Sequence, residues 1–158
     1  MSENIIISGG TKEEKYKSLL PQIEALIKEE DDLIANMANV SAALKFSLHF
    51  FWVGFYLIKN EQLILGPFQG PVACTRINKG KGVCGSSWQK EETIIVDDVD
   101  TFPGHIACSS LSKSEIVIPI FNSKKQCVGV LDVDSEQYAT FDNIDAVYLQ
   151  QIVAMLNF

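Results

Sequence analysis

The sequence lacks several features that would assign it to a specialised class of protein. No apolar run reaches the roughly 18 residues that cross a bilayer, and the longest extends only from Phe50 to Ile58. The first ten residues lack the basic and apolar segments of a secretion signal. Basic residues are outnumbered, with 13 Lys and Arg against 20 Asp and Glu. We therefore expect a cytoplasmic protein whose partners include neither membrane nor nucleic acid, because an anionic partner requires a basic surface.

Closely spaced cysteine pairs are also absent. The chain has four cysteines, at Cys74, Cys84, Cys108 and Cys127. Structural zinc sites generally use ligands only a few residues apart, so the spacing disfavours a zinc site with His49 or His105, and we expect no metal and no cofactor. A chain of 158 residues, 47% of them hydrophobic, can bury a core without disulfide bonds. In a reducing compartment its thiols are therefore expected to be free or redox-active.

Residue periodicity predicts one α+β domain over residues 1–158. Apolar residues at helical spacing predict helices over 11–30, with Pro21 as a candidate kink, and over 31–48, followed by a closing helix with Thr140 as its N-cap. Alternating or β-branched runs predict five or six strands, over 50–58, 62–66, 71–77, 93–98, 115–121 and 126–134. Residues 83–90 are expected to form a short helix, and 98–113 a long loop. This order fits an antiparallel sheet with helices on one face and a loop-covered pocket on the other.

Strand alternation places aromatic and acidic side chains on one face of the expected sheet. Trp52 and Tyr56 share a face with Gly54, whose missing side chain leaves room between the two rings. The polar faces of two later strands carry three carboxylates, at Glu115, Asp132 and Asp134. If these faces coincide, the carboxylates converge beneath the rings and form a hollow suited to a small cationic group such as an ammonium. The alternative is that each carboxylate is a solvated surface charge.

Three of the cysteines lie in sequence contexts that favour reactive thiols. Cys84 follows the glycine-rich loop 80–82 at the start of the short helix, where the helix N-terminus stabilises a thiolate. Cys108 lies in the long loop, and Cys74 is expected on a strand face that also carries a basic residue. Cys127, on an apolar strand face, is interpreted as an inert core thiol. Any one of them could simply be buried, but the three together indicate thiol redox chemistry.

Four segments together carry a family resemblance. They are WVGFY at 52–56, GPFQGPVACTRINKGKGVCG at 66–85, HIACSS at 105–110 and LDVDS at 131–135. In these segments the sequence resembles the free methionine-(R)-sulfoxide reductases, which are single GAF domains, and the resemblance covers almost the whole chain. It implies a GAF-like fold and the thiol-dependent reduction of free L-methionine (R)-sulfoxide to methionine.

The resemblance also implies roles for individual residues. Cys108 would be the nucleophile that attacks the sulfoxide sulfur and becomes a sulfenic acid, Cys84 the resolving thiol that forms a disulfide with it, and Cys74 an accessory thiol. Thioredoxin would reduce the disulfide, and the chain would form a homodimer. One carboxyl group would stay protonated to help the oxygen leave. The residues expected to bind the substrate are Trp52, Tyr56, Glu115, Asp132 and Asp134. The rival hypothesis is a non-catalytic GAF sensor module that binds a small ligand.

Overall fold

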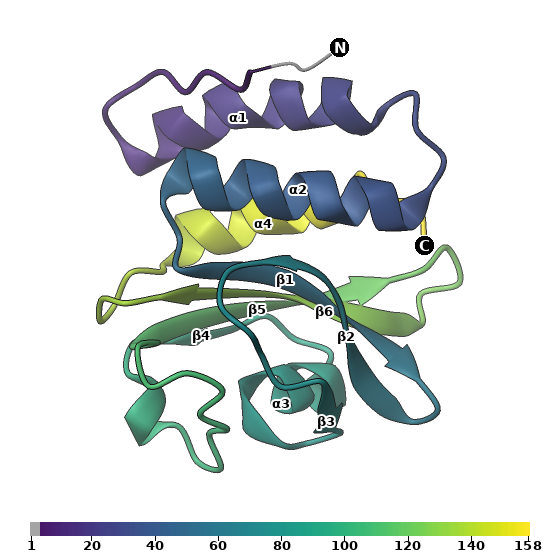
Figure 1. Cartoon of the computed structure of the whole chain (residues 1–158), viewed down its shortest axis with the longest axis vertical. Helices are drawn as coiled ribbons and strands as arrows, with labels where there is room; N and C mark the ends of the chain where they lie inside the picture. The colour runs from purple at the N-terminus through teal and green to yellow at the C-terminus, as the bar shows by residue number, and fades with distance from the viewer. Residues whose placement is uncertain (1–3) are drawn as a thin grey trace.

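A six-stranded antiparallel sheet lies at the centre of the computed structural model, which describes residues 4–158 (Figure 1). The strands are β1 (Trp52–Lys59), β2 (Gln62–Gln69), β3 (Arg76–Asn78), β4 (Ile94–Val96), β5 (Ser114–Phe121) and β6 (Cys127–Ser135), arranged in the order β3-β2-β1-β6-β5-β4. The helices are α1 (Lys12–Ile27), α2 (Leu33–Leu48), α3 (Gly82–Lys90) and α4 (Asn143–Ala154). The predicted α+β architecture is confirmed. No helix within residues 4–158 is long and apolar enough to cross a membrane.

Three of the helices cover one face of the sheet. In Figure 1, α2 and α4 lie directly against the strands, and α1 packs on the outer side of both. The core between these layers takes alternate residues from the central strands, such as Val53 and Phe55 from β1 and Leu131 and Val133 from β6. The opposite face of the sheet is covered by α3 and by the loops around it. A second apolar cluster, which includes Trp52, lies on that face.

The helix boundaries follow from side chains that cap exposed backbone N–H groups. Thr11 caps α1 in a reciprocal box with Glu14, which satisfies N–H groups that have no partner inside the helix. Pro21 lies inside α1 and does not end it. The predicted cap of the last helix is wrong. Thr140 donates its hydroxyl to Ser135 Oγ at 2.7 Å, and Asp142 caps α4 instead.

The segment from residue 71 to 77 is shorter as a strand than the sequence predicts. Only Arg76–Asn78 forms β3, and residues 71–75 form a loop. Gly70 turns the chain with a φ of 140°, and Pro71 has no N–H group to donate to a ladder. Since the loop is not paired along its length, it can lie across the face of the sheet that α3 covers, and it carries Cys74 there.

Candidate active site

A pocket opens on the face of the sheet that carries α3. Strands β1, β5 and β6 supply its floor, and its rim comes from the loop 71–75, from the start of α3 and from the segment 105–112. It encloses about 50 Å³. Seven of the eight residues expected in the site line this pocket. The eighth, Cys74, is bonded to Cys108, which lines it.

Strand pairing brings the three carboxylates together. Asp134 lies opposite Trp52 in the ladder between β1 and β6, and opposite Glu115 in the ladder between β5 and β6. Asp132 lies opposite Gly54, two residues further along β1. Their shared parity therefore places all three on the pocket face, as strand alternation indicates. Glu115 and Asp132 are buried rather than solvated.

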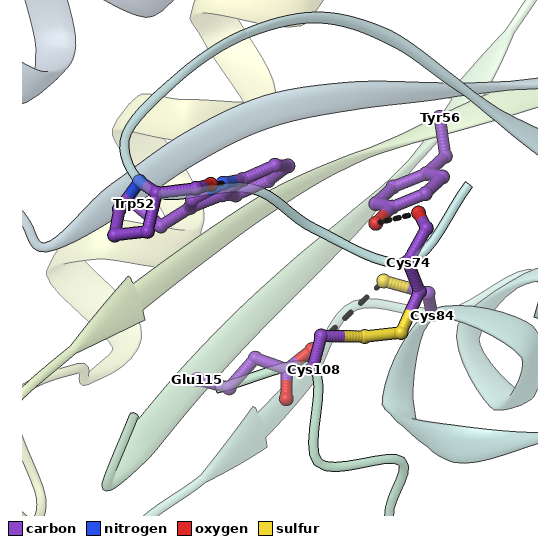
Figure 2. The surroundings of a disulfide bond; sticks show 7 residues. Trp52, Tyr56, Cys74, Cys84, Cys108 and Glu115 are labelled. Atoms are coloured by element: carbon purple, nitrogen blue, oxygen red, sulfur yellow. Dashed lines mark hydrogen bonds between the residues drawn. A yellow bond between two sulfur atoms is a disulfide. The ribbon is translucent and has the colours of Figure 1, made fainter. Parts of the chain in front are cut away.

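The two aromatic side chains form one wall and hold the loop above them. The Trp52 and Tyr56 rings stack with centroids 6.0 Å apart. Trp52 Nε1 donates a hydrogen bond to the Pro71 carbonyl at 3.0 Å, and Tyr56 Oη donates one to the Cys74 carbonyl at 2.8 Å (Figure 2). Both bonds fix the loop 71–75 over the pocket. The Gly54 backbone leaves the space that the Trp52 ring occupies, because a Cβ there would lie 2.4 Å from Trp52 Cη2.

Burial of like charges raises the pKa values of the acidic cluster. Burial raises the pKa of Asp132 to about 6. The pKa values of Glu115 and Asp134 are also raised well above their ordinary range. Burial is the larger cause, and the nearby charge of Asp132 is the next. The cluster therefore retains protons at pH values where solvated carboxyl groups have lost them. Sequence reasoning missed Ser112, which donates a hydrogen bond to Asp134 Oδ1 at 2.5 Å, because no spacing rule connects a loop serine with a strand residue.

The disulfide bond of the structure corrects the predicted pairing. Cys108 is bonded to Cys74, with their Cα atoms 5.6 Å apart, and not to Cys84 (Figure 2). Cys84 is only 3% exposed, and its Sγ lies 3.9 Å from Glu115 Oε1 in the pocket floor. The two loops that carry Cys74 and Cys108 meet above it. The expectation that Cys84 pairs with Cys108 is therefore wrong for the disulfide that the structure contains.

The environment of Cys84 also contradicts the expected thiolate. Burial raises the pKa of this thiol well above its ordinary value, and the negative charges of Asp132 and Glu115 raise it further. The favourable dipole at the start of α3 is thus outweighed by desolvation and by like charge. Cys84 is a neutral thiol in this state.

Cys127 faces the opposite side of the sheet from the one predicted. Between β5 and β6 the register shifts next to Phe121, which pairs with Cys127 while Ile120 pairs with Gly129. Such a bulge moves the following side chains to the other face. Cys127 therefore packs, half-buried, against the cluster on the pocket side of the sheet and not against the helices. Its thiol is free and donates to the Gly129 carbonyl at 3.5 Å.

Known proteins are similar to this chain in both fold and sequence. The family described as GAF domain matches residues 29–156. The chain is 60% identical to GAF domain-containing protein A of Dictyostelium discoideum, over 99% of each chain. It is 44% identical to the free methionine-R-sulfoxide reductase of Escherichia coli (strain K12), over 92% of this chain and 88% of that one.

A solved structure is similar over nearly the same length. The free methionine-R-sulfoxide reductase from Neisseria meningitidis, in complex with its substrate, superimposes with a TM-score of 0.94 and 51% sequence identity. The superposition covers 97% of this chain and 92% of that one. By fold, therefore, the chain is a GAF domain. Within that class it belongs to the free methionine-R-sulfoxide reductase family, which confirms the resemblance inferred from the sequence.

The raised pKa of Asp132 makes a prediction about stability. Its pKa rises from an ordinary 3.8 to about 6 on folding, so this carboxyl group favours the folded state fully below pH 4. That contribution is lost as the pH rises through 6, because the Asp132 carboxyl group ionises more easily in the unfolded chain than in its buried site. Asp132→Asn should therefore increase the free energy of unfolding, relative to wild type, by about 1–3 kcal/mol more at pH 8 than at pH 4.

Urea unfolding at the two pH values measures this difference. Glu136→Gln, at an exposed carboxylate just after β6, is the matched control and should show no such dependence on pH. A gain from Asp132→Asn that is as large at pH 4 as at pH 8 would contradict the assignment of a buried, ionisable carboxyl group.

Proposed function

We propose that this chain reduces free L-methionine (R)-sulfoxide to methionine in this pocket. The observation that carries the proposal is a cysteine pair, Cys74 and Cys108, joined at the mouth of a pocket with aromatic walls and a carboxyl floor. A disulfide is the two-electron oxidised form of two thiols, which matches the two electrons that a sulfoxide needs. Membership of a family whose relatives in Escherichia coli and Neisseria meningitidis are named for this activity supports it.

The proposed reaction proceeds in two covalent steps. The Cys108 thiolate attacks the sulfoxide sulfur, the oxygen is transferred to Cys108 as a sulfenic acid, and methionine leaves. The Cys74 thiol then condenses with the sulfenic acid, forms the disulfide and releases water. Two thiols thus supply the two electrons and two protons that convert sulfoxide to thioether and water. Cys74 takes the resolving role that the sequence assigned to Cys84, since it is the thiol bonded to Cys108.

The acidic cluster supplies the proton and binds the amino group in this proposal. A sulfoxide oxygen leaves readily only when it is protonated, so a carboxylic acid that remains neutral near pH 7 assists the first step. Burial raises the pKa of Glu115 well above its ordinary value, which fits that role. Asp132, with Asp134 beside it, accepts hydrogen bonds from the substrate ammonium. Trp52 and Tyr56 enclose the side chain and its methyl group.

Reduction of the disulfide completes the proposed cycle. Cys108 is exposed and Cys74 is half-buried, so an external dithiol can attack the bond from the pocket mouth. We assign this step to thioredoxin in a cytoplasmic setting, where dithiol proteins keep such bonds reduced. Two further electrons regenerate both thiols and allow another turnover.

A coupled assay tests the activity. Reduced chain with thioredoxin, thioredoxin reductase and NADPH should oxidise NADPH when free methionine (R)-sulfoxide is added. The (S) form should give at least tenfold less turnover, because the pocket orients one sulfoxide oxygen toward the acidic cluster. Absence of turnover with the (R) form would contradict the proposed function and would favour a ligand-binding sensor module instead.

Single-turnover chemistry separates the three thiols. In the absence of reductant, Cys108→Ser should release no methionine, whereas Cys74→Ser should release up to one per chain without forming a disulfide. Cys84→Ser should still form the disulfide between Cys74 and Cys108. Methionine is quantified by chromatography and free thiols by titration, with Cys127→Ala as the control that behaves as wild type. A disulfide that forms in Cys74→Ser but does not form in Cys84→Ser would instead support a pairing of Cys84 with Cys108.

We further propose that the chain forms a homodimer through the solvent-exposed side of α2. Ile34 near the start of this helix and Phe46 near its end are 54% and 67% exposed, and large exposed apolar side chains often mark interfaces. Sedimentation velocity should give the mass of two chains for wild type and of one for Phe46→Asp. Phe121→Asp, at an exposed phenylalanine on β5, should remain dimeric. A single-chain mass for wild type would exclude the dimer.

A further inference from the structure

Cys84 lies outside the disulfide and is surrounded by acidic groups in the pocket floor. Its Sγ, a carboxyl oxygen of Glu115 and one of Asp132 all lie within 4.8 Å of one another, and all three residues are buried. Asp132 is only 7% exposed, yet no group among residues 4–158 donates a hydrogen bond to its Oδ1 atom. A buried carboxylate oxygen without a hydrogen-bond partner is unfavourable. It therefore indicates that this part of the pocket accommodates a ligand.

We propose that Cys84, Glu115 and Asp132 bind a thiophilic divalent cation such as Zn²⁺ or Co²⁺. One sulfur and two carboxyl oxygens are a ligand set that such ions accept, with three protein ligands and an open fourth position toward the cavity. One sulfur and two oxygens around a tetrahedral zinc ion lie about 3.3–3.7 Å from one another. The three groups therefore need to move together by about 1 Å, which side-chain rotation provides without a change in the strands. When the cation binds, the thiol proton and any proton held by the two carboxyl groups are released to solvent.

The charge of the cluster favours a cation in this position. The salt bridges found among residues 4–158 pair Lys12 and Lys17 with acidic groups elsewhere, so the carboxyl groups of the pocket have no basic partner there. A divalent cation compensates several negative charges at once, and the thiol distinguishes soft cations from Mg²⁺ or Ca²⁺.

The position of Cys84 makes the cation site independent of the disulfide. Oxidation joins Cys74 to Cys108 and removes both thiols as metal ligands, but Cys84 remains free. Cys127, also a free thiol, is the first residue of β6 and is not part of the cluster. The cation also occupies Asp132, to which the proposed function assigns the substrate ammonium, and Glu115, to which it assigns the proton transfer. Cation and free methionine sulfoxide should therefore exclude one another, in the oxidised as well as in the reduced chain.

Cobalt titration of the oxidised chain tests this site, because a thiolate bound to Co²⁺ gives a charge-transfer absorption that carboxylate ligands do not. Wild type and Cys127→Ala should show this absorption with a stoichiometry of one ion per chain, and Cys84→Ala should lose it. Asp132→Asn should weaken Co²⁺ binding at least tenfold, and circular dichroism shows whether each variant is folded. The absence of the absorption in wild type, or its survival in Cys84→Ala, would overturn the proposal, as would undiminished affinity in folded Asp132→Asn.

Competition distinguishes failure of this inference from failure of the proposed function. Excess methionine (R)-sulfoxide should lower the apparent affinity of the oxidised chain for Co²⁺, and EDTA should remove the ion. Binding of Co²⁺ through Cys84 without any effect of the sulfoxide would contradict the shared pocket, while the cation site would stand. Turnover in the coupled assay without Co²⁺ binding would leave the reductase activity intact and reject the cation site.

Discussion

The register between β1, β6 and β5 is the constraint on which the pocket depends. Glu115 and Asp134 face each other across one ladder, and Asp132 lies opposite Gly54 across the other. Because side chains alternate along a strand, a slip of one residue would turn these carboxylates into the apolar layer beneath the helices. It would also expose Leu131 and Val133, which are fully buried there. The hydrophobic core on one face thereby fixes the chemistry on the other.

The acidic cluster shows how this fold supports an unfavourable arrangement. Three neighbouring carboxyl groups and a thiol share one buried region, and their raised pKa values reflect the free energy that ionisation requires there. Strands paired on both sides hold these groups in place, and the large apolar layer under α1, α2 and α4 provides stability that does not depend on them. Strongly shifted pKa values of this kind are typical of functional sites where a protein transfers a proton or binds a charge.

The parts of the site that follow strand alternation could be predicted from the sequence, and the parts that depend on loops could not. A period of two residues suffices to place Asp132 on the pocket face. Which thiol meets Cys108 depends instead on the path of the loop 71–75, which is set by tertiary hydrogen bonds from Trp52 and Tyr56. The face of Cys127 depends on a bulge that leaves no mark in the periodicity.

The hydrogen bond from Tyr56 to the Cys74 carbonyl has a kinetic consequence. Cys74 and Cys108 are 34 residues apart in the chain, and a flexible loop of that length would let one thiol diffuse away from the other between encounters. Anchored by this bond and by that of Trp52 to Pro71, the Cys74 thiol stays at a high effective concentration near its partner. In the proposed reaction, a sulfenic acid on Cys108 would then be captured within the chain before peroxide could oxidise it irreversibly to a sulfinic acid.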